Sequence, residues 1–422
     1  MVSENGWIEY SLEEVTENFD SVRVPVKKAD RRSGPYPYYG ASGIVDHVDN
    51  YIFDGEFLLV AEDGENLRTR KTPIAFIATG RFWVNNHAHI VRGNHLANTR
   101  FLAYALDRTN ISGYLSGTTM PKLTQGNLNR VRLSLPPRPI QEAIVTLAKA
   151  LDDKIELNRR MNETLEAMAR AIFKSWFVDF DPVRAKLDGR QPPGMDADTA
   201  AIFPDHFEHT ELGLAPKGWT IRPVGEVVEA VGGGTPSTKE SLFWDAGMHH
   251  WATPKDLSNL DAPILLDTNR KVTDAGLKKI SSGLLPKGTL LLSSRAPVGY
   301  LAIAEVPIAV NQGFIAMKCD GDVSNYFMLN WCRENIDEIE RRASGTTFQE
   351  ISKRNFRPIP MIVPPSQLVG AFNGAVSSTY SRIASNLRES ETLAATRDTL
   401  VPKLLSGEIR VRDAESTAGA VT

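Results

Sequence analysis

The sequence predicts an α+β fold in which one unit occurs twice. Each copy is a mixed α/β module followed by a long helix, and the two helices are expected to pair within the chain as a coiled coil. Three observations lead to this class: an internal repeat, short apolar runs separated by Gly and Pro, and near-heptad apolar spacing. The length of 422 residues suits several domains, and 42% hydrophobic with 23% charged residues is typical of chains that bury cores.

The repeat is clearest where it runs without a gap. Residues 117–124 reappear as 345–352, and the same offset of 228 aligns the Pro-Pro pair at 136–137 with that at 364–365. It also aligns Asn158 with Asn386. Because the agreement continues through both helix-like and strand-like stretches, chance similarity between turns does not explain it, and the sequence indicates a duplication.

The first part of each copy is expected to contain short strands. The apolar runs punctuated by Gly and Pro lie at residues 57–60, 74–77, 89–92, 290–293, 309–310 and 314–317. The boundaries that follow are 1–136 for the first module, 137–180 for its helix, 181–217 for a linker, 218–365 for the second module, 366–408 for the second helix and 409–422 for a flexible tail.

The second part of each copy is expected to be a long amphipathic helix. Apolar residues recur at steps of three and four from Pro139 onward, and about 40 residues at ~1.5 Å each make a rod of roughly 60 Å. A rod of this length needs a partner as long as itself, and the economical partner is the other helix. The alternative is packing on its own module or on another subunit. Candidate seam residues are Leu151, Ile155, Leu165, Trp176, Phe177, Ile383 and Leu387.

Charge and cysteine content exclude several classes. The 48 basic and 51 acidic residues give a net charge of −3, so a nucleic-acid partner would need local patches or a more basic subunit. No apolar run approaches the roughly 20 residues of a membrane span, and no signal peptide is visible. Two cysteines are too few for a disulfide framework. A cytoplasmic, reduced protein is the expectation.

The sequence lacks recognisable catalytic motifs. None of its Pro-Pro pairs belongs to an Asp/Asn-Pro-Pro-aromatic loop of an amino-methyltransferase, and the Gly-rich run at 232–236 lacks the lysine of a P-loop. Residues 40–43 miss the last glycine of a nucleophile elbow. His87 and His89 would share a strand face, as metal ligands can, but no third and fourth ligand stands nearby. No metal site is predicted, and ordinary core or surface histidines are favoured.

The duplication itself suggests a DNA reader, because a two-fold repeat imitates a dimer that contacts a bipartite site. Polar loops at 116–122, 232–239, 251–256 and 293–299 could hydrogen-bond phosphates and base edges, although ordinary turns have the same composition. The candidate DNA contacts are Thr118, Thr119, Lys122, Thr235, Ser237, Lys255, Ser294, Arg295, Thr346 and Thr347.

The motifs taken together resemble the specificity subunit of a type I restriction–modification enzyme. They are Gly-Gly-Gly-Thr-Pro-Ser at 232–237, Trp-Ala-Thr-Pro-Lys-Asp at 251–256, residues 285–299, Val-Asn-Gln-Gly at 310–313, the Gly-Thr-Thr pattern of each copy, and the central stretch 175–183. The first module differs most from these family motifs. Its residues 60–64 correspond to 292–299 of the second module, and its residues 84–87 correspond to 310–313.

The resemblance implies two target-recognition domains joined by two antiparallel helices, each domain reading half of an asymmetric DNA sequence. It implies docking of two methylation subunits, which carry S-adenosylmethionine, and of restriction subunits, which use ATP and Mg. This chain would then bind no cofactor itself and would not be an enzyme, and Trp176, Phe177 and Phe180 would serve in docking or in closing the helices against the domains. The alternatives are a modification-only complex, a catalytic methyltransferase with a remote cofactor site, and a coiled-coil scaffold without DNA contact.

Overall fold

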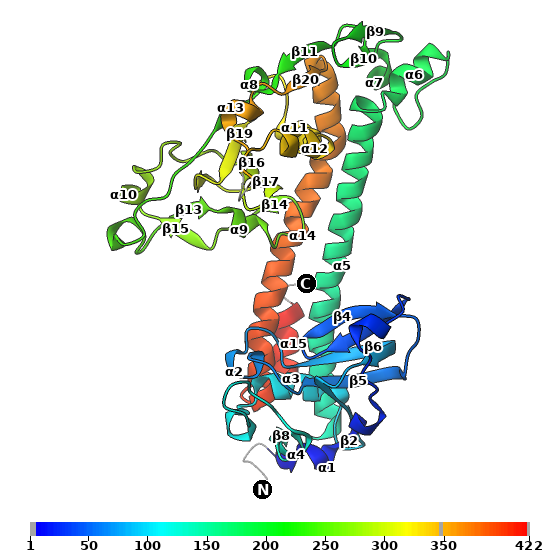
Figure 1. The fold of residues 1–422 in the computed structure, drawn as a ribbon, viewed down its shortest axis with the longest axis vertical. Helices are drawn as coiled ribbons and strands as arrows, with labels where there is room; N and C mark the ends of the chain where they lie inside the picture. Colours follow the sequence, from blue (N-terminus) through cyan, green and yellow to red (C-terminus); the bar gives the residue numbers. More distant parts are fainter. Residues whose placement is uncertain (1–5, 346–348, 420–422) are drawn as a thin grey trace. The chain divides into compact units, whose positions relative to one another are not determined.

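The structure is a computed structural model that describes residues 6–345 and 349–419 (Figure 1). It divides into two compact units. The first comprises Met1–Ile155 with Glu391–Thr422, and the second comprises Glu156–Ser390. Each unit therefore combines one module with parts of both long helices, α5 (Arg138–Phe177) and α14 (Ser366–Ser406).

The module of the first unit is built on a six-stranded sheet with the order β2-β7-β5-β6-β3-β4. Its pairs are antiparallel except for β3 with β6. The strands are β2 (Thr16–Asn18), β3 (Tyr36–Gly40), β4 (Gly43–Val48), β5 (Phe53–Ala61), β6 (Ala75–Val84) and β7 (Ala88–Gly93), with β1 (Ile8–Ser11) paired to β8 (Arg132–Leu135). The helices are α1 (Leu12–Val15), α2 (Asn66–Thr69), α3 (Thr99–Arg108) and α4 (Gln125–Asn129).

One face of this sheet packs on α3 and on the long helices. Asn98 caps α3 by accepting from the backbone N–H groups of Arg100 and Phe101, which fixes where the helix begins. The shared core joins Leu58 and Phe101 of the module to Leu151 of α5 and Leu393 of α14. The apolar face of each long helix is therefore buried against both the other helix and the module.

The module of the second unit has a five-stranded sheet, β12-β19-β16-β17-β14, and a three-stranded sheet, β15-β13-β18. The strands are β12 (Glu229–Val231), β13 (His249–Ala252), β14 (Ile264–Leu265), β15 (Arg270–Val272), β16 (Leu290–Ser294), β17 (Val298–Ala304), β18 (Ile308–Val310) and β19 (Phe314–Lys318), with β11 (Thr220–Pro223) paired to β20 (Pro360–Val363). The helices are α8 (Val224–Val227), α9 (Pro254–Leu257), α10 (Asp274–Leu277), α11 (Asn325–Glu334), α12 (Ile336–Arg341) and α13 (Lys353–Phe356).

The predicted pairing of the two long helices is confirmed, and the pairing is antiparallel. In the second unit Asn386 Nδ2 donates to Asn162 Oδ1 at 2.9 Å, and Phe173 lies against Phe372. In the first unit Arg397 Nη1 donates to Asp152 Oδ1 at 2.7 Å. The later a residue lies in α5, the earlier its partner lies in α14, as expected for two helices that run in opposite directions.

A buried polar cluster interrupts the apolar seam within the second unit. Asn158 and Asn386, equivalent positions of the repeat, meet directly, with Asn158 Nδ2 at 3.4 Å from the Asn386 carbonyl oxygen. Asn158 Nδ2 also lies 2.8 Å from Glu389 Oε2. Buried amides of this kind favour one register of a helix pair over others, because a shifted register would leave them unpaired.

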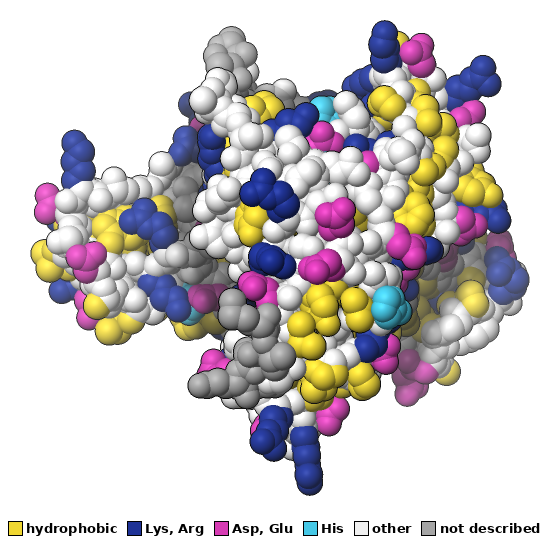
Figure 2. Space-filling model, turned by 90° about the horizontal axis from the view of Figure 1, so that it is seen from below, with side chains coloured by type: hydrophobic (Ala, Val, Ile, Leu, Met, Phe, Trp, Pro, Cys, Tyr) yellow, Lys and Arg dark blue, Asp and Glu magenta, His cyan; other side chains and the backbone are white. Residues whose placement is uncertain are grey.

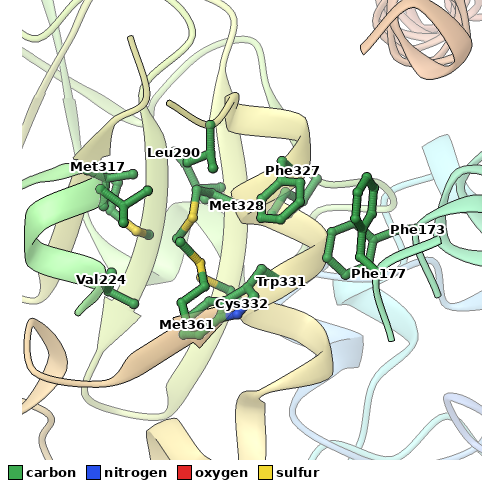
Figure 3. Close-up of a cluster of buried hydrophobic side chains, with 14 of the residues drawn as sticks. Phe173, Phe177, Val224, Leu290, Met317, Phe327, Met328, Trp331, Cys332 and Met361 are labelled. Carbon is green, nitrogen blue, oxygen red and sulfur yellow. The ribbon is translucent and has the colours of Figure 1, made fainter. Parts of the chain in front are cut away.

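The aromatic residues at the end of α5 are not exposed, contrary to the expectation for a docking surface. Phe177 and Phe180 are each 8% exposed, and Trp176 packs against the same core of the second unit. Figure 3 shows Phe173 and Phe177 directed toward Phe327 of α11, with ring centroids 5.1 and 5.0 Å away. They close α5 against the module, which is the other role that the resemblance offered.

Two segments are more ordered than the sequence suggested. The expected flexible tail contains α15 (Val411–Gly419), whose Ala414 and Ala418 are buried, because small side chains one helical turn apart allow close packing. The expected linker holds α6 (Asp181–Leu187), α7 (Ala197–Ile202) and the hairpin of β9 (Phe207–Thr210) with β10 (Gly213–Pro216). Among the described residues, no helix is both long and apolar enough to cross a membrane.

Candidate DNA interface

The motif segments of the second module converge on one part of its surface. The Gly-rich run follows β12 and lies against the end of β18, where Gly234 N donates to Val310 O at 3.0 Å. Trp251 Nε1 donates to Gly234 O at 3.1 Å, and Asn311 N donates to Ala252 O at 3.0 Å. Motifs that are far apart in the sequence therefore form one backbone framework.

Glycine is required in this framework for a steric reason. A Cβ on Gly233 would lie 1.7 Å from Val310 O, so no other residue fits without moving the backbone. The close approach allows Thr235 Oγ1 to donate to Gln312 Oε1 at 2.6 Å. Thr235, Ser237 and Lys255 are all exposed around it, as a DNA contact would need to be.

A second framework holds the loop that carries the Gly-Thr-Thr motif. Ser294 N donates to Gly313 O at 2.8 Å, and Ile351 N donates to Ser294 O at 2.9 Å. Across the base of the loop, Ser344 and Glu350 exchange backbone hydrogen bonds. The predicted contacts Thr346 and Thr347 lie outside the described residues.

The two candidates on β16 and just after it differ in exposure. Ser294 is 2% exposed and its Oγ is buried, so the structure corrects the expectation that this hydroxyl faces DNA. The backbone of Ser294 instead anchors the loop. Arg295 is partly exposed, and its Nη1 lies 3.8 Å from Glu350 Oε2.

The first module repeats the loop framework bond for bond. Glu62 N donates to His87 O at 2.9 Å, and Leu123 N donates to Glu62 O at 2.8 Å. Ser116 and Lys122 exchange two backbone hydrogen bonds of 2.8 Å. Glu62 therefore occupies the place of Ser294, as the match of residues 60–64 to the second module implied.

The loop of the first module presents its polar side chains outward. Gly117 has a φ of +87°, and a Cβ there would lie 2.3 Å from Met120 O, so glycine makes the turn possible. Arg68 Nη2 donates to Gly117 O at 3.2 Å from outside the loop. Thr118 and Thr119 are exposed, and Lys122 lies 3.2 Å from Glu62 Oε1.

The charges at equivalent positions of the two loops are reversed. Asp63 lies opposite Lys122 in an isolated backbone β-bridge of the first module, and Arg295 lies opposite Glu350 in the equivalent β-bridge of the second. Asp63 also lies 2.8 Å from His87 Nδ1. Sequence reasoning missed Asp63 and Glu350, although the offset of 228 already pairs Lys122 with Glu350. The same backbone thus presents different chemistry in each module.

The seam candidates lie in the helix pair. Leu151 and Ile383 are buried, while Ile155, Leu165 and Leu387 are partly buried and pack on the cores of their own units. On the face shown in Figure 2, Lys and Arg side chains are interspersed with Asp and Glu. This agrees with the absence of a basic block in the sequence. Within the described ranges, no three His, Cys, Asp or Glu residues are placed to hold a metal ion.

Comparison with known proteins bears on both modules. The family model described as "Type I restriction modification DNA specificity domain" matches residues 4–167 and again 216–368. The type I restriction enzyme HindI specificity subunit of Haemophilus influenzae is 27% identical over 332 residues, which cover 69% of this chain and 72% of that protein. The MjaIX specificity subunit of Methanocaldococcus jannaschii is 38% identical over 161 residues, or 37% of each chain.

A solved structure shares the fold. The crystal structure of the S subunit of a type I restriction–modification system from M. genitalium aligns with a TM-score of 0.60. The alignment covers 96% of this chain and 97% of that one, at 15% sequence identity.

Proposed function

Because this chain belongs to the type I restriction–modification DNA specificity family, we propose that its two modules read the two halves of one bipartite, asymmetric DNA site. The observation that carries the proposal is the duplicated loop framework. Its backbone hydrogen bonds are the same in both modules, but the side chains that it presents differ. Loops that share a backbone arrangement but differ in side chains can contact DNA in the same way and still read different base sequences.

The physical chemistry of the loops supports contact with a duplex. Thr118, Thr119 and Lys122 in the first module, and Thr235, Ser237 and Lys255 in the second, are exposed donors for phosphates and base edges. With a net charge of −3, this chain alone would supply few phosphate contacts. We therefore assign the remaining contacts to methylation subunits that dock on the helix pair.

The chain is the non-catalytic subunit of this scheme, and its relatives are named specificity subunits of type I restriction enzymes. The methylation subunits would bring S-adenosylmethionine, and restriction subunits would bring ATP and Mg chemistry, all in the cytoplasm. The deciding experiment is methylome sequencing of a host that carries this chain with its methylation subunit. One new bipartite motif supports the proposal, whereas an unchanged methylome despite an assembled complex favours a scaffold without DNA readout.

The isolated chain is expected to transfer no methyl groups. It has no Asp/Asn-Pro-Pro-aromatic loop to hold a target amino group, so labelled-methyl transfer by rigorously purified chain should stay at background. Addition of the methylation subunit should restore transfer to DNA that carries the site. Transfer by the chain alone would contradict its assignment as a non-catalytic subunit.

Arg295→Ala is expected to weaken binding of the assembled methyltransferase to its site by about 1–3 kcal/mol, because a guanidinium can form two hydrogen bonds to guanine or phosphate. Glu350→Gln is the matched control, since it removes the same ion pair from the other side. If Arg295 contacts DNA, the Gln variant binds as well as the parent or better. Equal losses in both variants would assign Arg295 to the loop alone.

A further inference from the structure

A buried ionic network lies directly beneath the Gly-Thr-Thr loop of the first module. Its centre is His89 on β7, whose side chain is 1% exposed. His89 Nδ1 lies 2.5 Å from Asp20 Oδ2, and His89 Nε2 lies 2.7 Å from the carbonyl oxygen of Leu123. Leu123 is the residue at which the loop rejoins the framework described above.

Both ring nitrogens of His89 therefore face hydrogen-bond acceptors. A neutral imidazole has one N–H, so either neutral tautomer would set a nitrogen lone pair against an oxygen at 2.5 or 2.7 Å. Only the doubly protonated ring can donate to both Asp20 and Leu123. The geometry thus describes a buried imidazolium that links a fixed carboxylate to the loop.

The remaining members of the network compensate this buried charge. Arg23 Nη1 donates to Glu62 Oε2 at 2.8 Å and to Ala88 O at 2.8 Å, and Lys122 lies 3.2 Å from Glu62 Oε1. Asp20 Oδ1 accepts from a backbone N–H of β7 at 2.8 Å. The titratable groups that face His89 are Asp20 and Glu62, with the cations Arg23 and Lys122 beyond them.

The two carboxyl groups are held in their charged forms. Burial alone would raise the pKa of Asp20, but the hydrogen bond and positive charge of His89 outweigh it and lower that pKa. Burial likewise opposes ionisation of Glu62, whose pKa is lowered by Arg23, His89 and Lys122 together. The His89 ring therefore faces two acceptors, the Asp20 carboxylate and the Leu123 carbonyl oxygen. A neutral ring has one N–H and could donate to only one of them.

Among the described residues, this network occurs in the first module and not in the second, although the backbone framework above it occurs in both. Strands β5 and β7 place Val60 opposite His89, and β16 and β19 place Leu292 opposite Ile315. Ile315 therefore takes the place of His89, and it is buried in an apolar core. The second module forms the same backbone hydrogen bonds without a buried histidine, so these bonds do not by themselves require His89.

We propose that His89, fixed by Asp20, is a positioning residue for the loop at residues 116–122, and that recognition by the first module depends on the hydrogen bond from its ring to the Leu123 carbonyl oxygen. The inference rests on the proposed DNA-reading function. His89 would not touch DNA; it would set the height and tilt of Thr118, Thr119 and Lys122 by tethering Leu123. The dependence should be absent from the second module, where Ile315 provides no donor.

Two substitutions separate the bonds of the ring. In His89→Gln the amide nitrogen lies near the place of Nε2 and keeps a donor for Leu123, whereas in His89→Asn it lies near Nδ1 and keeps only the donor for Asp20. The assembled methyltransferase is assayed for methylation of its own site and of duplexes with base changes in one half-site or the other. His47→Gln, at an exposed position on β4, is the matched control.

We expect His89→Asn to lower discrimination at one half-site by about tenfold and at the other by less than about twofold. His89→Gln should recover most of the loss. The control should match the parent at both half-sites.

The outcomes are separable from those of the proposed function. If the Asn and Gln variants lose discrimination equally, and in proportion to their loss of thermal stability, His89 is a core residue only. That result would overturn the inference. Equal effects at both half-sites would overturn it as well. If the parent enzyme itself shows no preference at either half-site, the proposed function fails instead.

Discussion

Replacing Phe372 by alanine is expected to lower the free energy of unfolding of the second unit by about 3–5 kcal/mol. Phe372 is fully buried where α14 meets α5 and the module. Its ring centroid lies 5.7 Å from that of Phe173, 5.4 Å from that of Phe177 and 6.5 Å from that of Phe327. Truncation removes all of these contacts and leaves a cavity that rigid helix backbones cannot collapse to fill.

The measurement is urea unfolding followed by tryptophan fluorescence, since Trp176 lies in the same aromatic cluster, 6.2 Å from Phe372 by ring centroids. Leu242→Ala is the control, because Leu242 is 68% exposed on the same unit and its loss should cost under about 0.5 kcal/mol. An unchanged slope with a lower midpoint would show lost stability. A loss below about 1 kcal/mol in Phe372→Ala would mean that this cluster does not hold the helices to the module.

The elements with a strong apolar signal were predictable from the sequence. Residues 57–60, 89–92, 290–293 and 314–317 lie in β5, β7, β16 and β19, where apolar side chains meet neighbouring strands on both edges. The long helices were predictable because apolar residues recur along them at helical spacing. The α15 helix was not, since its buried face is made of Ala414 and Ala418, which carry almost no hydrophobic signal.

The candidate site was predictable only in part, because burial depends on strand pairing. The repeat offset placed Lys122 and Glu350 at equivalent loop positions, and the structure keeps that equivalence. Nothing in the local sequence shows that Ser294 points inward, because its exposure is fixed by the register of β16 with β17 and β19. The partners of His89 were equally hidden, since Asp20 and Leu123 are distant in sequence and meet only across the folded module.

The polar cluster of the helix pair marks where the pair can be lengthened. Asn386 bonds to Asn162, and Asn158 bonds to Glu389. Insertions after Asn158 and after Asn386 do not separate either pair. Asn162 and Asn386 both stay on the second-unit side of the inserted residues, and Asn158 and Glu389 both stay on the first-unit side. Seven residues in each helix also keep the heptad seam in phase.

Such a double insertion is expected to change the spacer of the recognised DNA and leave both half-sites unchanged. Each helix grows by about 10 Å at ~1.5 Å per residue, which equals roughly three base pairs at 3.4 Å each. Three base pairs also turn the duplex by about 100°, so affinity should fall or the spacer should settle on a smaller increment. The reading loops are untouched by the insertion.

Methylome mapping of the insertion variant measures this directly. A four-residue double insertion is the comparison: it adds ~6 Å but rotates the helix surface by about 40°, which breaks the apolar seam. The four-residue insertion should lower the stability of the chain more than the seven-residue insertion does, although it requires a smaller change in spacer length. An altered half-site with the original spacer, in the seven-residue variant, would show that the helices do not set the distance between the two recognition events.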